Sequence, residues 1–392
     1  MRELTEQAAR LLVPTEEQRH LAAAAADAFA RSNPGPAGPS AADTGATPDT
    51  GAMPDTGDAP DTGDAPGADP DGGFDRARWA ELAGTDLLGA AVPEESGGLG
   101  LSVPDLVVLT EQAGRALLPG PVVESIWVVA PALAALGPPW APALAALLRG
   151  DLVGSAVDGT LRGPDLDVAG YVVVPTGGAD RLYDAAELGP IARVPTQDRA
   201  ERSFRLTGLP DVGGDPTGGD VPVVPTAPPT DGLGGLDRGR LGAAAYLLGV
   251  ADGLLAQGIG YARLREQFGR PIGAFQAVRH RLVDAYVELE FARSAVWSAG
   301  CDVAAGDPAA RVAIRCASVA AKRAFAEVDR HCLQVHGGIG FTWEHPLHGW
   351  LKRGATFAAR YGLRRELETD LGELLLAEVA GRPPGRPPRP HI

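Results

Sequence analysis

Apolar residues in the first part of the chain recur at the spacing of amphipathic helices. One such stripe is formed by Leu106, Leu109, Ala113 and Leu117. The segment Val122–Leu148 is apolar, but four prolines interrupt it, which favours two short core helices over a membrane span. We therefore predict an N-terminal helical domain over residues 1–148.

Inside that domain, residues 32–73 consist mainly of Pro, Gly, Ala, Asp and Thr and contain no Lys or Arg. The tetrapeptide Pro-Asp-Thr-Gly occurs three times, starting at positions 48, 54 and 60. A segment with so little apolar content cannot offset the entropy cost of ordering, which predicts a disordered acidic insert. The proline-rich, basic segment 381–392 is predicted to be a disordered tail.

The pattern changes after Asp151, where short β-branched runs are separated by Gly, Pro and Asp. These runs predict a shortened antiparallel β domain over residues 149–230, with strands in Leu152–Val157, Val168–Val174, Ile191–Val194, Phe204–Leu206 and Val221–Val224. Residues 231–380 are predicted to form a C-terminal helical bundle, with long alanine-rich helices in Leu241–Arg263, His280–Gly300 and Pro308–His336. The predicted fold class is therefore mostly α with a small β domain, and such long helices favour an oligomer.

The chain has 392 residues and a formal net charge of −15 at pH 7. Nucleic acid is not an expected partner, because phosphate binding needs a basic face. Cys301, Cys316 and Cys332 show no metal-ligand spacing, and we interpret them as reduced thiols that pack as small buried hydrophobes. With neither a secretion signal nor a membrane span visible, we expect a cytoplasmic protein.

Two segments of the C-terminal part carry candidate chemistry. Arg265 is predicted to end a helix just before Phe268 and a Gly-containing turn. An Arg in that place can bind a phosphate, and a neighbouring Phe can stack on a purine. The alternative is that Arg265 pairs with a surface acid while Phe268 fills the core. Gln276 follows on the next turn.

The second segment follows a long predicted helix. Gln334 closes that helix, and Gly337 and Gly338 would let the backbone approach a ligand closely. The alternative is an ordinary glycine helix stop, and the run is not a Rossmann fingerprint because no strand precedes it. The nearby histidines are interpreted as satisfied loop residues and not as a metal site: His331, His336, His345 and His348.

Together these segments resemble the acyl-CoA dehydrogenase family. The resemblance rests on the order and the amino-acid sequence of four segments: Pro93–Gly100 (PEESGGLG) near the start, then Arg265–Ile272 (REQFGRPI), Phe275–Gln276 and Gln334–Thr342 (QVHGGIGFT). It covers nearly the whole chain outside the acidic insert and is weak between residues 151 and 230. It implies a three-domain architecture: N-terminal helical, middle antiparallel β and C-terminal four-helix bundle.

The resemblance also implies a function. Such proteins bind FAD between subunits, oxidise an acyl-CoA thioester to its trans-2-enoyl form and pass electrons to an electron-transfer flavoprotein. By that likeness Arg265, Phe268 and Gln276 would hold the adenosine and pyrophosphate part of an FAD seated mainly in a neighbouring subunit. The same contact would be completed by Gln334, Gly337 and Gly338.

The expected catalytic carboxylate is missing. Family members usually carry it in a loop about twenty residues past the glycine motif, where this chain has Tyr361, or on the helix that leads to Arg265, where it has Gly239. Tyr361 would be a poor base, because its reference pKa is near 10. Asp237 would point away from that position. Glu366 and Glu368 are possible stand-ins if the loop is shifted.

The β domain also lacks the strand sequence motifs whose residues usually contact the flavin ring in this family. Together, these departures resemble the non-catalytic subunit of heteromeric bacterial acyl-CoA dehydrogenases, whose catalytic subunit supplies the base and the flavin ring. Two hypotheses follow. The chain is either an FAD-using subunit that acts with a homologous catalytic partner or as a homo-oligomer, or a degenerate homologue that serves as a non-enzymatic binding or scaffold subunit.

Overall fold

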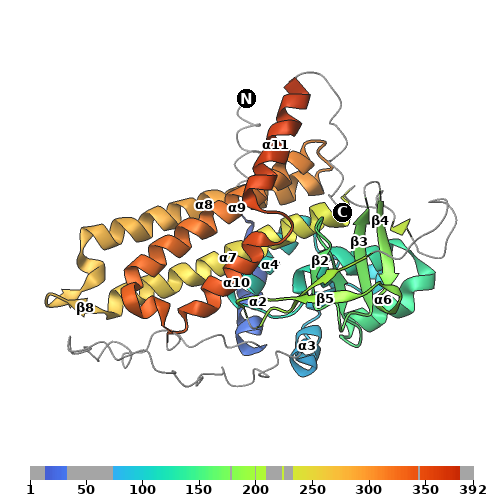
Figure 1. The fold of residues 1–392 in the computed structure, drawn as a ribbon, viewed down its shortest axis with the longest axis horizontal. Coiled ribbons are helices and arrows are strands. Elements are labelled where there is room, and N and C mark those ends of the chain that lie inside the picture. Colours follow the sequence, from blue (N-terminus) through green and yellow to red (C-terminus); the bar gives the residue numbers. More distant parts are fainter. Residues whose placement is uncertain are drawn as a thin grey trace.

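In the computed structural model, the described residues are 14–32, 74–176, 179–198, 200–208, 223–224, 233–342 and 345–379. The predicted acidic insert and basic tail lie outside these ranges, apart from residue 32. The remaining chain forms an elongated body, with helices along most of its length and the strands toward one end (Figure 1).

The first helices form a layer against the bundle. They are α2 (Glu16–Ser32), α3 (Arg76–Ala83), α4 (Val103–Arg115), α5 (Ala130–Ala135) and α6 (Ala141–Leu148). Ser102 caps α4 in a reciprocal capping box with Asp105, which sets the start of that helix. The apolar segment 122–148 gives α5 and α6 as predicted, preceded by a buried π-helical turn, η4 (Glu124–Val129). Leu87 and Leu88 follow α3 in a separate 3₁₀ turn, η2 (Leu87–Gly89).

In the part of this region that the structure describes, seven strands follow and form two small sheets. They are β1 (Gly154–Ala156), β2 (Arg162–Pro164), β3 (Tyr171–Thr176), β4 (Ala179–Asp184), β5 (Ile191–Val194), β6 (Ser203–Leu206) and β7 (Val223–Val224). The sheet orders are β1-β3-β4-β7 and β2-β6-β5.

The prediction of a purely antiparallel domain is wrong for one pair of strands. β1 and β3 are parallel, with Gly154 opposite Tyr171. The chain leaves β1, forms β2 in the other sheet and returns to the first sheet in its original direction, which is the crossover that parallel pairing requires. β2 and β4 were not predicted either. β2 contains Gly and Pro, and β4 contains charged residues, so neither reads as a β-branched run.

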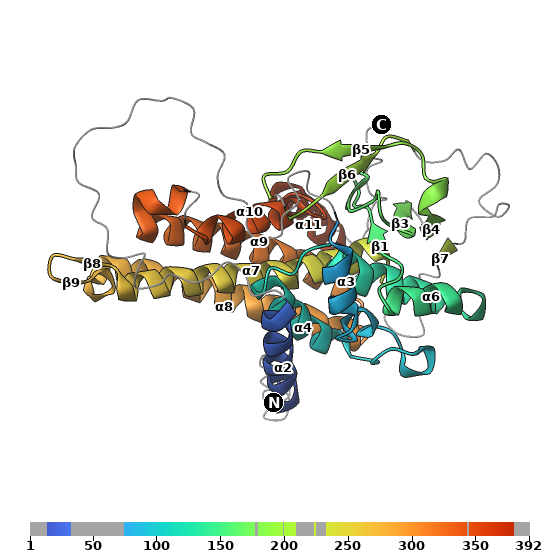
Figure 2. The same cartoon turned by 90° about the horizontal axis from the view of Figure 1, so that it is seen from below.

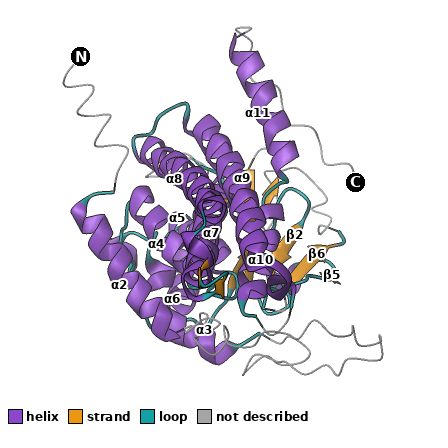
Figure 3. Cartoon of the chain, turned by 90° about the vertical axis from the view of Figure 1, so that its left-hand side faces the viewer, coloured by secondary structure: helices purple, strands orange, loops and turns teal. Residues whose placement is uncertain are grey.

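The C-terminal part consists of α7 (Gly235–Leu264), α8 (Gln276–Ala304), α9 (Ala310–His336), α10 (Leu347–Ala359) and α11 (Arg364–Val379). α7 packs against α4, α8, α9 and α10, and it lies among them when the bundle is viewed from its end (Figure 3). Its small residues allow this close packing: a Cβ at Gly249 would overlap the α4 backbone at Glu111.

Among the described residues, α7 is the one helix long and apolar enough to cross a membrane, and 78% of that apolar stretch is buried inside the protein. Its sequence is therefore that of a core helix. The mostly helical fold class with small sheets is confirmed. At the end of the bundle far from the β3–β4 sheet, the short strands β8 (Glu266–Gln267) and β9 (Arg270–Pro271) form a hairpin (Figure 2).

The three cysteines are free, but they do not share one environment. Cys332 is buried, Cys301 is half-buried and Cys316 is exposed. The prediction of small buried hydrophobes therefore fails for Cys316, which lies on the outer face of α9.

Candidate functional site

The two candidate segments meet at the hairpin end of the bundle. Tyr261 and Ala262 of α7 and Val335 of α9 form a small apolar core of their own. Ile272 and Ile339 pack against it from the segments that follow the two helices. Residues about seventy positions apart in the sequence are thereby held at one end of the molecule, which we call the bundle tip.

Arg265 and the hairpin are built on the last turn of α7. The Arg265 N–H donates to Tyr261 O at 2.8 Å, and Ile272 N–H donates to Arg265 O at 2.8 Å, closing the hairpin at its base. Phe268 and Gly269 form the two-residue turn with φ angles of 53° and 75°. Positive φ at both positions is what a type I′ hairpin turn requires, and Asn or Gly are its usual residues.

Phe268 is 92% exposed, so the alternative in which it fills the core is wrong. A bulky side chain with positive φ costs backbone strain, and such strain is found where surroundings or function favour it. No packing contact compensates for it in the core. Phe268 instead offers an aromatic face to solvent and touches Phe275 edge-on, with ring centroids 6.1 Å apart.

The glycine segment at the tip is equally open. Gly337 ends α9 with a φ of 63°, and a Cβ added at Gly337 or Gly338 would meet no atom within 4 Å. Gln334 is exposed one turn earlier. Gln276 is also exposed, at the start of α8, with its Nε2 3.4 Å from His280 Nε2. The tip thus presents an aromatic face, amide groups and accessible backbone, together with the partly exposed Arg265.

Two of the histidines, His336 and His345, pack against Tyr261 beneath this tip. His336 stacks on Tyr261 with centroids 4.5 Å apart and donates from Nδ1 to Cys332 O at 2.7 Å. Burial lowers the pKa of His336 to about 4, so its ring is neutral near pH 7. His331 and His336 are helical, so describing them as loop histidines was wrong. No metal-binding group of three or more side chains occurs in the described part of the chain.

A second site lies deep in the protein, where the two expected positions of the catalytic base face each other. A Cβ added at Gly239 would lie 2.7 Å from the hydroxyl oxygen of Tyr361 and closer still to two of its ring carbons. Real Cβ atoms essentially never approach that closely. Tyr361 therefore fills the space that a side chain at position 239 would need, and it is only 3% exposed.

Tyr361 is held in place by a buried carboxyl group. Its hydroxyl donates to Glu124 Oε1 at 3.1 Å, and Glu124 is fully buried on the η4 turn. Burial raises the pKa of both groups, and the nearby Glu124 adds to the rise for Tyr361. The Tyr361 hydroxyl therefore loses its proton less readily here than in water, and it cannot act as the base that abstracts a proton from the substrate at neutral pH.

Three arginine–carboxylate pairs extend from Glu124 through the interior. Arg360 lies 3.4 Å from Glu124 and donates to Glu201 at 2.7 Å. Arg353 donates to Asp198 at 2.6 Å. These pairs join η4, the loop between β5 and β6, and helix α10. We call Glu124, Tyr361, Arg360, Glu201, Arg353 and Asp198 the buried plug.

Sequence reasoning missed the buried plug. The available signal was Glu124, a single acid within an otherwise apolar run, because a buried charge in a core segment needs a partner. Its partners lie more than seventy residues away in the sequence, and no local pattern identifies them.

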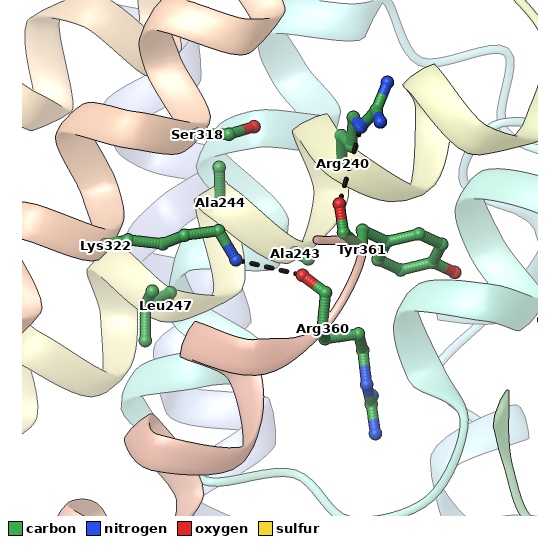
Figure 4. A pocket seen from close by; sticks show the side chains of 8 residues that line it. All are labelled: Arg240, Ala243, Ala244, Leu247, Ser318, Lys322, Arg360 and Tyr361. Carbon is green, nitrogen blue, oxygen red and sulfur yellow. Dashed lines mark hydrogen bonds between the residues drawn. The ribbon is translucent and has the colours of Figure 1, made fainter. Parts of the chain in front are cut away.

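A small cavity lies beside Tyr361, between α7, α9 and the end of α10 (Figure 4). Its volume is about 10 Å³, which is the threshold for a single water molecule. Lys322 borders it and donates to the carbonyls of Ala358 and Arg360, each at 2.9 Å. A pocket for a drug-sized ligand is of the order of 300 Å³ or more. This cavity is far below that size.

The possible replacement acids do not reach the position of the missing base. Asp237 pairs with Arg240 at 3.1 Å and lies 3.6 Å from Arg315, so it points toward α9 as expected. Glu366 accepts from the Leu363 N–H at 2.8 Å and caps α11. Glu368 pairs with Arg364 on the surface. The idea that Glu366 or Glu368 replaces the base is therefore not supported by this arrangement.

Comparison with known proteins identifies the family. The family model for the acyl-CoA dehydrogenase N-terminal domain matches residues 64–141, and the model for the C-terminal domain matches residues 232–360. Acyl-CoA dehydrogenase IpdE2 of Mycobacterium tuberculosis is 34% identical over 289 residues, which are 72% of this chain and 81% of IpdE2. The chain belongs to the acyl-CoA dehydrogenase family.

Further relatives agree with that assignment. Acyl-CoA dehydrogenase FadE34 of M. tuberculosis is 34% identical over 353 residues, which are 79% of this chain but only 45% of FadE34. Among solved structures, the steroid ACAD Tcur3481-Tcur3483 matches with a TM-score of 0.70 and 26% identity, covering 93% of this chain and 99% of that one. Butyryl-CoA dehydrogenase of Megasphaera elsdenii, at 18% identity and a TM-score of 0.68, shows the shared fold; the match covers 93% of this chain and 99% of that one.

Acyl-CoA dehydrogenases are oxidoreductases that normally bind FAD, and the bundle tip fits one end of that group. An exposed aromatic face suits a purine, while backbone N–H groups and a guanidinium suit a diphosphate. Both tip glycines leave the space that a Cβ would fill. The interior does not fit an acyl thioester equally well, since the buried plug fills the region around positions 239 and 361.

Proposed function

We propose that this chain is the non-catalytic subunit of a heteromeric, FAD-dependent acyl-CoA dehydrogenase. A homologous partner would supply the catalytic carboxylate, the acyl-CoA pocket and the seat of the flavin ring. This chain would contribute the bundle tip, which would complete the binding of the adenosine diphosphate part of that FAD. An electron-transfer flavoprotein would accept the electrons.

The observation that carries this proposal is the pairing of Gly239 with Tyr361. Losing a carboxylate at either position alone would leave an inactive but open pocket. Here the space at one position is filled by the residue at the other, and the filling side chain is anchored on Glu124 at 3.1 Å. The resulting packing supports a chain that is stably folded without a substrate pocket at this place.

The bundle tip supports a role toward a neighbouring subunit. Phe268 projects away from its own core on a strained hairpin, and Gly337 and Gly338 are open to solvent. Groups exposed in this way cannot enclose a dinucleotide by themselves. They can complete a site whose other wall is another chain, which favours an assembly of subunits over an enzyme that binds its cofactor within one chain.

The name of one relative favours a bulky substrate. Tcur3481-Tcur3483 is named for two components and as a steroid ACAD. By that likeness the partner's pocket would take a CoA thioester with a large, branched or polycyclic acyl group. FAD, when bound, accepts the hydride that leaves the β-carbon of such a thioester. This chain's own residues would bind and orient that cofactor without touching the reacting carbons.

Co-expression with a homologous subunit that carries the missing Glu tests the proposal. The chain alone, the partner alone and the co-purified complex would be compared by flavin absorbance and by acyl-CoA-dependent dye reduction. We expect tightly bound flavin and activity in the complex only. Activity of the chain alone would refute the non-catalytic assignment, and a complex without flavin would favour the scaffold hypothesis.

Point variants in this chain then test where the cofactor is held. In the complex, we expect Arg265→Ala to lower the amount of flavin that is retained, because the charge-assisted contact of the guanidinium with the diphosphate would be lost. Arg263→Ala is the matched control, since Arg263 is an exposed Arg of the same helix end outside the motif. Equal flavin content in both variants would contradict a cofactor role for Arg265.

A further inference from the structure

The hairpin at the bundle tip contains a second arginine that the proposed function leaves unused. The Arg270 guanidinium carbon lies 4.2 Å from the centroid of the Phe275 ring. Phe275 in turn meets Phe268 edge-on, with the two rings 86° apart. These three side chains form a ladder that rises from the start of α8 to the exposed turn of the hairpin.

The stack fixes Arg270 without using its hydrogen-bonding capacity. A guanidinium that lies over an aromatic ring keeps its five N–H donors at its edges, where they remain available. Arg270 is exposed, and none of the ion pairs found among the described residues includes it. In a chain with 50 acidic and 35 basic residues, an arginine that is stacked in place but pairs with no carboxylate of the described residues points to an anion from elsewhere.

The backbone of the hairpin adds to this preorganisation. Gln267 and Arg270 are paired in the β8–β9 register, and the turn between them holds Phe268 at a φ of 53°. Below it, Arg279 donates from Nε to Gly273 O at 2.9 Å, which ties the segment between the hairpin and α8 to that helix. Arg270 and Phe268 are thus presented from one short, internally bonded unit.

We propose that Arg270, held on Phe275, donates to a phosphate oxygen of the dinucleotide seated in the partner subunit. This inference rests on the proposed function and adds to it a second cation and the aromatic residue that positions it. Phe275 acts through Arg270 and is a positioning residue. The ligand recognised is the adenosine diphosphate part, so the flavin ring contributes nothing to this contact.

Binding of two flavins to the flavin-free complex tests the inference. FAD contains the adenosine diphosphate part, whereas FMN contains the flavin ring with a single phosphate. Affinities would be measured by flavin fluorescence for the unchanged complex, Arg270→Ala, Arg270→Lys and the control Arg263→Ala. We expect Arg270→Ala to weaken FAD binding by about tenfold to hundredfold, as the loss of a hydrogen bond to a charged group does, and to leave FMN binding unchanged.

Two further variants separate charge from stacking. Arg270→Lys keeps the charge but not the planar stack, and we expect it to restore only part of the FAD affinity. Phe275→Leu keeps an apolar side chain and leaves Arg270 without its support, so we expect a loss of FAD affinity smaller than that of Arg270→Ala. Thermal unfolding of the complex would verify that the fold is retained.

The outcomes distinguish this inference from the proposed function. If Arg265→Ala releases FAD while Arg270→Ala stays within twofold of the unchanged complex, the ladder has no role and the proposed function stands. If Arg270→Ala weakens FMN and FAD equally, the contact does not involve the adenosine diphosphate part and the inference fails. If the unchanged complex binds no flavin, both fail together.

Discussion

The contact between Gly239 and Tyr361 makes a quantitative prediction about stability. In an exposed helix interior, replacing Gly by Ala typically stabilises by about 1 kcal/mol. Here the new Cβ would lie 2.7 Å from the Tyr361 hydroxyl, inside a buried and hydrogen-bonded cluster. Overpacking of that kind costs about 1–3 kcal/mol. We therefore expect Gly239→Ala to lower the free energy of unfolding by roughly 1 kcal/mol, because an overpacking cost of about 2 kcal/mol outweighs a propensity gain of about 1 kcal/mol.

Removing the ring should reverse the sign of this effect. Tyr361→Gly alone is expected to cost about 3–5 kcal/mol, as large-to-small core changes do. Gly suits that position because Tyr361 has a φ of 58°. In the Tyr361→Gly background, Gly239→Ala meets no ring and should stabilise by about 1 kcal/mol. The two changes would then be coupled by roughly 2 kcal/mol, well above the deviation of about 0.5 kcal/mol seen for independent sites.

Urea denaturation of the four proteins, followed by circular dichroism, measures the cycle. Tyr361→Phe is the control background, since it keeps the ring and loses only the hydrogen bond to Glu124. Gly239→Ala must remain destabilising there. A cost for Gly239→Ala that is the same in all backgrounds would refute the conclusion that Tyr361 occupies the space of position 239.

Three further predictions concern other sites. Burial and neighbouring acids raise the pKa of Asp165 to about 8, above its unfolded value near 3.9, so the contribution of Asp165 to stability is lost as the pH rises from about 4 to above 8. The melting temperature of Asp165→Asn should therefore fall less than that of the unchanged protein between pH 5.5 and pH 8.5. An equal fall in both proteins would contradict the raised pKa. Arg353→Met leaves Asp198 buried without its partner 2.6 Å away and should cost about 3–5 kcal/mol in urea unfolding; a cost under about 1 kcal/mol would show that the pair is solvated. A thiol reagent should label the exposed Cys316 in the native protein but not the buried Cys332, whose pKa burial raises to about 12; mass spectrometry of the labelled peptides would show the reverse if the exposures are wrong.

The sequence by itself determined much of the helical architecture. The helices predicted at 241–263 and 280–300 fall within α7 and α8, and the helix predicted at 308–336 matches α9 apart from its first two residues. Their periodic apolar positions are a local property, because a helix closes its hydrogen bonds within a few residues of the chain. The end of a helix at Arg265 and the Gly-containing turn after it were predicted for the same reason, because both are encoded within about ten residues. The pairing of β8 with β9 was not predicted.

The strands were predicted less well. Short apolar and β-branched runs indicated β1, β3, β5, β6 and β7, but strand direction depends on which strand becomes the neighbour. The parallel pairing of β1 with β3 follows from the route of the chain through a second sheet. The alternation of residues within β1 or β3 does not indicate whether the two strands pair in parallel or antiparallel.

The candidate site divides in the same way. Its residue types at the tip were evident from the sequence, whereas the exposure of Phe268 and the stacking of Arg270 on Phe275 depend on the folded hairpin. The sequence showed only that Gly239 and Tyr361 are not carboxylates. Tertiary structure decided that they touch, and that Glu124 anchors the ring across 237 positions of chain. Contacts of that separation are fixed by packing of the whole domain, because no local hydrogen-bond pattern or periodicity reaches so far.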